Sequence, residues 1–260
     1  MTTSPADRVG SPYDQPELYD LMLDSLDFDQ AFWLRVAREG NGPLLDVGCG
    51  TGRVLLRLLE AGIDADGIDA STPMVERARA RAAAAGFRTR LEVADMRDFT
   101  LPRRYARAIC TFNAFAHCET PDDQLRALRC IHHHLAPAGA LVLFMSYPSP
   151  RYWNEPDGDP VLEREIELPE NGHRLQMWDQ RFKNPVEQYQ RSEMEIRELD
   201  ANGARVATHR SRAIQRWVYR WEMELLLRAA GYARWEIQGG FDGEPLERPD
   251  QPMIAWGWRS

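Results

Sequence analysis

Short apolar runs alternate with segments of helical periodicity between residues 43 and 147. The first run, Leu44–Val47, leads through a glycine-rich turn into residues 54–59, whose apolar side chains share one helix face. Strand–helix units of this kind are typical of a parallel sheet with helices on both faces. The pattern therefore predicts a doubly wound α/β core. Further strands are expected at residues 65–69, 90–94, 106–112 and 140–146, with helices over 73–86, capped by Thr72, and over 122–135.

The pattern changes after Tyr147, where prolines become frequent and four segments suit long strands. In residues 193–199 polar and apolar side chains alternate, which is typical of an antiparallel strand with one solvated face. The four segments are 161–168, 173–182, 187–199 and 204–219, followed by a helix over 219–230 and strands at 234–238 and 252–258. We therefore expect an N-terminal helical lid (1–40), a core (41–147), an antiparallel β cap (148–217) and a C-terminal part (218–260) that completes the core sheet.

Composition narrows the function classes. The 260 residues include 32 Lys and Arg against 40 Asp and Glu, a net charge of −8, whereas nucleic-acid binders normally carry a basic excess. No stretch approaches the roughly 18 to 20 apolar residues of a membrane helix, and the first ten residues lack the apolar region of a signal peptide. The four cysteines show no CxxC spacing, which fits a reducing compartment. We expect a cytoplasmic protein that binds neither nucleic acid nor a membrane.

Candidate chemistry gathers where the predicted parallel strands end. Three glycines, Gly48, Gly50 and Gly52, follow the first strand and let the backbone approach a ligand closely. Asp69 ends the second strand, where a carboxylate can accept hydrogen bonds from two ribose hydroxyls. The third strand ends at Asp95-Met96, which offers an acceptor for the exocyclic amine of adenine beside an apolar side chain. These positions together predict a ligand that contains adenosine.

Two other function classes compete with this interpretation. A dinucleotide fingerprint, GxGxxG, requires glycine at position 53, but Arg53 stands there and the turn reads GxGxG. An NAD-dependent oxidoreductase is therefore the weaker alternative. The second alternative is a non-catalytic protein, which keeps the same fold and binds the same adenosine-containing cofactor.

The run Asp46-Val47-Gly48-Cys49-Gly50-Thr51-Gly52, with Asp69, Asp95-Met96 and residues 111–117, resembles the class I S-adenosylmethionine-dependent methyltransferases. The layout is similar to that of the sugar N,N-dimethyltransferases, which carry an antiparallel insertion after the fifth strand. The resemblance implies a Rossmann-like, mostly parallel seven-stranded sheet of order 3-2-1-4-5-7-6, whose last strand runs antiparallel. It also implies S-adenosylmethionine as cofactor, S-adenosylhomocysteine as product, and a small-molecule acceptor methylated at nitrogen or oxygen.

The same resemblance assigns roles to single residues. Asp46 would lie near the ammonium group of the cofactor, and Tyr13 and Tyr19 belong to a segment that folds over it as a lid. The positions that the resemblance gives to the cofactor are Tyr19, Asp46, Gly48, Gly50, Gly52, Asp69, Ala70, Met74, Asp95, Met96 and Phe112.

Methyl transfer mainly requires alignment of the reacting atoms in a dry site, with a positioned base if the acceptor is a hydroxyl. His117, just past the fourth strand, is the best base candidate, and Tyr13 is the second catalytic candidate. Structural roles compete with both. His117 also suits a loop histidine bonded to backbone, and Tyr13 and Tyr19 also suit the packing of an N-terminal helix.

The cap leaves further alternatives open. Its aromatic residues suit either the core of the meander or the wall of an acceptor pocket, and its arginines suit either an anionic substrate or pairing with Glu163 and Glu195. The residues concerned are Tyr152, Trp153, Trp178, Trp217 and Tyr219, and Arg151, Arg181 and Arg216. Residues 132–134 are three histidines whose side chains diverge by about 100° on a helix, so no metal site is expected there. An exposed strand edge in the cap is compatible with a homodimer.

Overall fold

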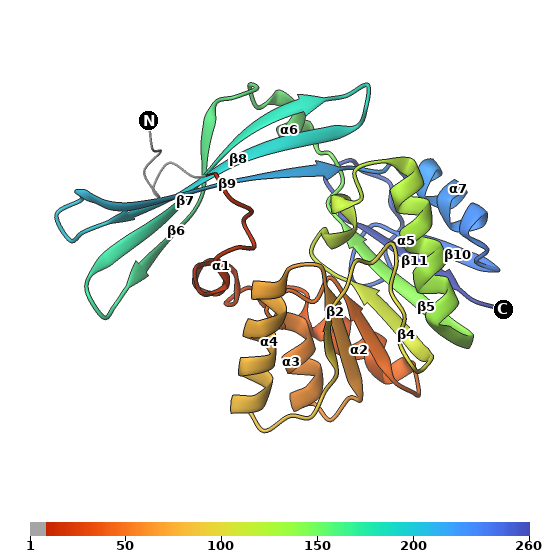
Figure 1. The fold of residues 1–260 in the computed structure, drawn as a ribbon. Coiled ribbons are helices and arrows are strands. Elements are labelled where there is room, and N and C mark those ends of the chain that lie inside the picture. The colour runs from red at the N-terminus through yellow and green to blue at the C-terminus, as the bar shows by residue number, and fades with distance from the viewer. Residues whose placement is uncertain (1–8) are drawn as a thin grey trace.

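A computed structural model describes residues 9–260 (Figure 1). Residues 1–8, which belong to the expected lid and to the segment inspected for a signal peptide, lie outside the described residues. The elements in chain order are α1 (Pro16–Leu23), α2 (Gln30–Glu39), β1 (Leu44–Val47), α3 (Arg53–Glu60), β2 (Ala65–Asp69), α4 (Thr72–Ala84), β3 (Leu91–Val93), β4 (Tyr105–Cys110), the 3₁₀ helix η2 (Ala114–His117), α5 (Pro121–His134), β5 (Leu135–Met145), α6 (Pro150–Asn154), β6 (Pro160–Leu168), β7 (His173–Asn184), β8 (Tyr189–Leu199), β9 (Arg205–Arg216), α7 (Arg220–Ala230), β10 (Arg234–Gln238) and β11 (Met253–Trp258). None of the helices within residues 9–260 has the length and apolarity that crossing a bilayer requires.

The central sheet has seven strands in the order β10-β11-β5-β4-β1-β2-β3. Strand β1 pairs in parallel with β2 and β4, whereas β11 pairs antiparallel with β5 and β10. The expected order and the expected antiparallel last strand are therefore confirmed. Every residue of β1 is buried, because helices cover both faces of a parallel sheet and leave its central strand no solvated side.

The core lies on both faces of this sheet. On one face, Trp33 of α2, Leu55 of α3 and Val75 of α4 belong to one buried cluster. On the other face, Leu128 of α5 and Met223 of α7 belong to a second cluster. The two layers hold the carboxyl ends of β1, β2 and β4 at one edge of the sheet, where the predicted site residues follow.

Strands β6 to β9 form a separate four-stranded antiparallel sheet, the cap, which reaches away from the central sheet in Figure 1. The cap is an insertion between β5 and α7, as the pattern after Tyr147 predicted. Its strands alternate between two faces, so that Asp179 on β7 faces the opposite way from its neighbour Trp178.

The N-terminal segment of residues 10–23 connects the cap with the core, and Figure 1 shows α1 between the cap and α4. Gly10 bonds to the edge strand β9, donating to the Arg210 carbonyl over 3.1 Å and accepting from the Arg212 N–H over 2.9 Å. Arg77 of α4 forms an ion pair with Asp20 at 2.8 Å, and Arg81 pairs with Asp24 directly after the segment at 2.9 Å. The segment is therefore tied to both parts.

Some element boundaries differ from the expectation. Strand β4 ends at Cys110 and not at 112, because Phe112 and Asn113 adopt left-handed backbone with φ of 48° and 64°. The Asn113 side chain accepts from the Ser146 N–H over 2.6 Å and holds this turn against the end of β5. A left-handed aromatic residue is unusual and costs backbone strain, which makes it a sign of function.

Helix caps account for two further differences. Ser71, and not Thr72, caps α4, because its hydroxyl accepts from the Met74 N–H while Thr72 already belongs to the helix. Helix α6 was not predicted, although Ser149 caps it and Pro150 occupies its first turn. Five residues are too few for helical periodicity to show in the sequence.

Candidate active site

Two adjoining cavities open at the carboxyl edge of the central sheet. The smaller, about 500 Å³, lies over the ends of β1, β2, β3 and β4. The larger, about 1110 Å³, lies between the cap, the end of β5 and the N-terminal segment. The two share five lining residues, which mark the place where a molecule in one meets a molecule in the other: Ser11, Tyr13, Asp14, Tyr19 and Phe112.

The glycine-rich turn after β1 forms one wall of the smaller cavity. A side chain on Gly48 would lie 2.5 Å from the Ala114 Cβ, so this position has no room for one. Gly50 has φ of 56°, and its missing Cβ would point into open space. The first glycine therefore permits close packing of the turn on η2, and the second leaves the backbone accessible to a ligand.

Asp69 lies at the end of β2 and holds the glycine-rich turn in place through hydrogen bonds. One carboxylate oxygen accepts from the Gly50 N–H over 2.9 Å, and the other accepts from the Ser71 N–H over 2.8 Å. Burial raises the pKa of this carboxyl, while the two backbone hydrogen bonds lower it. A carboxylate has about four acceptor positions, so two of them are left for a ligand in the cavity.

Asp46 ends β1 and is buried, with 1% of its surface exposed. Neither of its carboxylate oxygens has a hydrogen-bond partner among the described residues. Burial raises its pKa to about 7, and the nearby guanidinium of Arg53 opposes that rise. An unpartnered buried carboxylate is unfavourable without a cation, so this position suits a positively charged group of a ligand.

Asp95 lies after β3 and forms the opposite wall beside Met96. It holds Arg97 in an ion pair of 2.6 Å and accepts from the Arg97 N–H over 2.8 Å. The hydrogen bonds from Arg97 lower the pKa of Asp95, which keeps it ionised as an acceptor. Arg97 also pairs with Asp123 of α5 at 3.1 Å, which fixes its direction.

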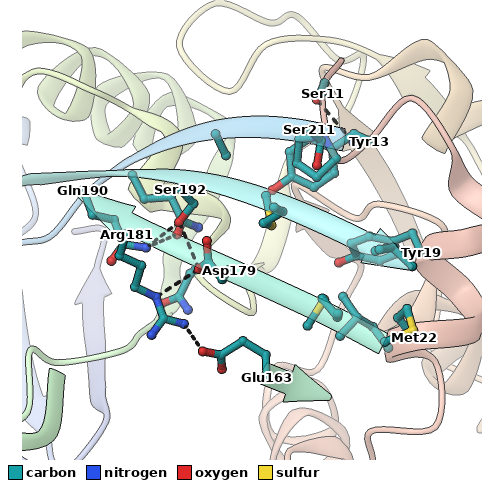
Figure 2. Close-up of a pocket in the computed structure, with 18 of the residues that line it drawn as sticks. Ser11, Tyr13, Tyr19, Met22, Glu163, Asp179, Arg181, Gln190, Ser192 and Ser211 are labelled. Atoms are coloured by element: carbon teal, nitrogen blue, oxygen red, sulfur yellow. Dashed lines mark hydrogen bonds and ion pairs between the residues drawn. The ribbon is translucent and has the colours of Figure 1, made fainter. Parts of the chain in front are cut away.

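Tyr13 and His117 meet at the junction of the two cavities. The Tyr13 hydroxyl and the His117 Nε2 are 2.5 Å apart, and the two rings cross nearly at right angles. Burial raises the pKa of Tyr13 far above its usual range and lowers that of His117. A neutral phenol thus faces a neutral imidazole. Tyr19 lies beside Tyr13, with ring centroids 6.1 Å apart (Figure 2).

The smaller cavity brings together most of the predicted site residues: Tyr13, Tyr19, Gly48, Gly50, Asp69, Ala70, Asp95, Met96, Phe112 and His117. Asp46, Gly52 and Met74 do not line it. Gly52 is the N-cap of α3 and adopts left-handed backbone, and Met74 is fully buried. In the cap, Tyr152 and Trp217 line the larger cavity, whereas Trp153 and Trp178 do not.

Arg53 is a site residue whose part the sequence analysis missed. Its side chain lines the smaller cavity, lies over the Phe112 ring at 5.3 Å, and pairs with Asp29 at 2.6 Å. The sequence indicated only that Arg53 replaces a glycine. Several acids precede it within residues 14–29, and no local pattern selects Asp29 among them.

Comparison with known proteins agrees with this geometry. Residues 44–139 match the profile of a family described as a methyltransferase domain. The cypemycin N-terminal methyltransferase of a Streptomyces species is 26% identical over 94% of this chain and 96% of its own length. The dTDP-3-amino-3,6-dideoxy-alpha-D-glucopyranose N,N-dimethyltransferase of Streptomyces fradiae is 33% identical over 49% of this chain and 51% of its own length.

Among solved structures, the CcbJ methyltransferase from Streptomyces caelestis superimposes with a TM-score of 0.75 at 20% identity. The match covers 96% of this chain and 98% of that one, so the likeness in fold includes the cap. The matched domain, the relatives and the turn after β1 agree with one another and favour methyl transfer over the oxidoreductase alternative. The chain therefore contains a methyltransferase domain over residues 44–139, and it is similar along its length to S-adenosylmethionine-dependent methyltransferases.

Proposed function

We propose that this methyltransferase transfers its methyl group to an amine nitrogen of a small molecule held in the larger cavity. The observation that carries the proposal is the Tyr13–His117 pair at the junction of the two cavities. It places a hydroxyl and a neutral imidazole where a cofactor in the smaller cavity would meet an acceptor in the larger one.

The smaller cavity fits S-adenosylmethionine in four respects. The open backbone at Gly50 suits the methionine part, and the unpartnered Asp46, which is buried beside the cavity and does not line it, is the carboxylate that suits its ammonium group. The free acceptor positions of Asp69 suit the ribose hydroxyls, and Asp95 with Met96 suits adenine. We therefore assign these residues to the cofactor, together with Tyr19, Gly48, Ala70 and Phe112 on the walls. Gly52 and Met74 would support the turn from outside the cavity.

The assignment of Asp69 is tested by Asp69→Ala with S-adenosylhomocysteine as the ligand. Loss of a charged acceptor shared by two hydroxyls should weaken binding by about 1.5 to 3 kcal/mol in calorimetry. Glu92→Gln, at a partly exposed position of the neighbouring strand β3 outside the cavity, is the control and should bind as the parent does. Equal affinity in parent and Asp69→Ala would remove the ribose assignment.

When bound, the cofactor supplies a methyl group on a positively charged sulfur. The chain itself has to align the acceptor and exclude water. Phe112, held in its left-handed turn, and Tyr19 line both cavities and would flank the path between them. The acceptor nitrogen would approach past the Tyr13 hydroxyl.

The proton chemistry favours an amine over a hydroxyl. Burial lowers the pKa of His117. The imidazole is therefore neutral, and it is a weak base. A weak base suffices for an amine, because its neutral form already offers a lone pair and only the ammonium formed on methylation has to lose a proton, whereas a hydroxyl needs a base that removes its proton during attack. Tyr13 would accept the proton of the nitrogen while its own hydroxyl proton moves to the Nε2 of His117. One relative named above is an N-terminal methyltransferase, and the other is an N,N-dimethyltransferase of an amino sugar. Both names support an amine acceptor.

The proposal is tested by incubating the protein and S-adenosylmethionine with amino sugars, small peptides and matched alcohols. S-adenosylhomocysteine release and a product heavier by one methylene should appear with amines. Methylation of alcohols alone would contradict the amine assignment, and the absence of product from every acceptor would contradict the proposed function.

Three further expectations belong to the same proposal. We propose a location in the cytoplasm, supported by four cysteines without a disulfide, and an acceptor other than nucleic acid, supported by the net charge of −8. We also propose a homodimer that pairs through a cap edge. Light scattering of the purified protein tests the dimer, and a monomer mass at micromolar concentration would refute it.

A further inference from the structure

The part of the larger cavity that lies on the cap carries a cluster of charged side chains. Arg181 of β7 pairs with Asp179 at 2.9 Å, with Glu155 at 2.8 Å and with Glu163 of β6 at 2.6 Å. Ser192 of β8 donates to the same Asp179 oxygen over 3.2 Å. We call these five residues the Asp179 cluster. Figure 2 shows Glu163, Asp179, Arg181 and Ser192 on the cap strands, apart from Tyr13 and Tyr19.

The charge of the Asp179 cluster is negative. It contains three carboxylates and one guanidinium, and all three carboxylates already bind that guanidinium. Arg151, which also lines the cavity, is largely exposed and pairs with Glu155 at 3.3 Å. The paired state of Arg181 agrees with the second of the two alternatives open for the cap arginines. The cluster therefore has no free cation with which to bind a phosphate.

Three buried polar atoms around the cluster lack a hydrogen-bond partner among residues 9–260. They are the Asp179 Oδ1, the Tyr152 hydroxyl and the Trp217 Nε1, and their residues all line the larger cavity. Asp179 and Trp217 are each only 7% exposed. A buried polar atom without a partner is costly, and three at one cavity indicate a ligand that supplies the partners.

These atoms define what the ligand must offer. Asp179 Oδ1 requires a hydrogen-bond donor, Trp217 Nε1 requires an acceptor, and the Tyr152 hydroxyl takes either. A hydroxyl meets both requirements, and an ammonium group meets the first while balancing the negative charge. A phosphate offers only hydrogen-bond acceptors and carries negative charge. The carboxylates of the Asp179 cluster therefore repel it.

We propose that the Asp179 cluster is a second recognition subsite, which binds a hydrogen-bond-donating group of the acceptor and rejects phosphate. This inference rests on the proposed function and deepens it. The acceptor has a methylated amine at Tyr13 and a hydroxyl or ammonium group at the cap. On this proposal, a nucleoside diphosphate sugar does not bind as the acceptor.

Binding without turnover tests the subsite directly. The protein saturated with S-adenosylhomocysteine is titrated with neamine, with methyl cellobioside and with dTDP-glucose, which present ammonium groups, hydroxyls and a diphosphate. We expect neamine, the glycoside or both to bind more tightly than about 1 mM and dTDP-glucose not to bind in that range. Whichever of neamine and methyl cellobioside binds more tightly shows whether the subsite prefers an ammonium group or a hydroxyl. Binding of dTDP-glucose, or of neither donor probe, would overturn the proposal.

Variants locate the binding at the cluster. Asp179→Asn should weaken binding of the better donor probe about tenfold, and Tyr152→Phe, which removes only the hydroxyl, about threefold. Glu167→Gln makes the same charge change at an exposed position of β6 outside the cavity and should have no effect. Affinity for S-adenosylhomocysteine should stay unchanged in all three.

Tyr152→Phe leaves the carboxylate in place and so tests the subsite even if Asp179→Asn does not fold. Parent-like binding of the probe by every folded variant would place the binding elsewhere and refute the inference. Failure of the proposed function appears in a separate assay, as the absence of S-adenosylhomocysteine release from every amine tested.

Discussion

Asp46 occupies a position where burial opposes its ionisation, and this has a measurable effect on ligand binding. Its pKa is raised to about 7 by burial, with Asp69 and Asp29 adding to the rise and Arg53 opposing it. An ammonium group placed beside Asp46 favours the carboxylate and pulls this pKa down. Binding of such a group therefore releases a proton wherever Asp46 is protonated beforehand.

We predict that affinity for S-adenosylhomocysteine rises between about pH 5.5 and 7.5 and then levels off. Calorimetry at pH 6 in two buffers of different ionisation enthalpy should detect the released proton. Asp46→Asn should lose both the proton release and the pH dependence. A pH-independent affinity in the parent would place the ammonium group away from Asp46.

The same residue affects stability in the opposite direction. Because its folded pKa lies above the unfolded value of about 3.9, the folded protein binds the proton more tightly than the unfolded chain does. The contribution of Asp46 to the free energy of unfolding is therefore largest below about pH 4 and is lost as the pH rises to about 7.

His117 and Tyr13 predict a pH profile for the chemical step. The lowered pKa of His117 means that the imidazole is already neutral at pH 7, so the rate should be flat above neutrality. Below an inflection that lies under the ordinary value of about 6.5, the rate should fall as the imidazole becomes protonated. Single-turnover rates at saturating cofactor measure this profile.

Substitutions separate the proton role from packing. His117→Asn and Tyr13→Phe should each slow transfer to an amine by about tenfold or less, and His117→Asn should remove the low-pH inflection. Affinity for S-adenosylhomocysteine serves as the control and should stay within about twofold of the parent. A parent-like rate and pH profile in both variants would show that the pair only packs.

At the scale of elements, a buried ion pair joins the N-termini of two helices. Arg53 begins α3, where the helix dipole disfavours a cation, and it pairs with Asp29, which precedes α2. Asp29 also accepts from the Trp33 indole over 3.0 Å, and its side chain is 2% exposed. Removal of one partner would leave the other charge buried and unpaired.

We predict that Asp29→Asn and Arg53→Met each lower the free energy of unfolding by about 3 to 5 kcal/mol, and that the double variant loses less than the sum. Urea denaturation of all four proteins measures the coupling. The pair of Arg57 and Glu60, one turn along α3 and half exposed, is the matched control, for which the coupling should be under about 1 kcal/mol. Additive losses at Arg53 and Asp29 would mean that the two residues act separately.

The sequence predicted the central sheet well because its inner strands are rich in apolar residues, and because β1 runs into the glycine-rich turn while β2 ends at Asp69. It could not predict the turn at Phe112, since nothing in the sequence marks an aromatic residue as left-handed. In the cap, the period of two separates Trp178 from Asp179 but does not tell which face covers a cavity. Tyr152 and Trp217 are therefore assigned to the cavity only by the structure.

At the scale of the whole molecule, residues 10–23 form a wall of both cavities. This segment is attached both to the cap and to helix α4 of the core. The cap holds Gly10 through backbone hydrogen bonds, and α4 holds Asp20 and Asp24 through arginines. Entry of a ligand into either cavity depends on how firmly this segment is held. Its ties to α4 are partly exposed ion pairs, worth up to about 1 kcal/mol each, so they can be weakened without unfolding the core.

We predict that the double substitution Asp20→Asn and Asp24→Asn loosens the segment while leaving Arg81 its contacts with Thr51 in the turn after β1. Affinity for S-adenosylhomocysteine should fall about three- to tenfold, because ligand binding must then order the segment as well. Limited proteolysis within residues 10–23 should become faster, and bound S-adenosylhomocysteine should slow it again. Glu17→Gln is the control on the same helix, since that side chain is 70% exposed and approaches Arg77 only to 4.0 Å. If the double variant is cleaved and binds as the control does, the other contacts of the segment hold it in place, and the ion pairs on α4 do not gate either cavity.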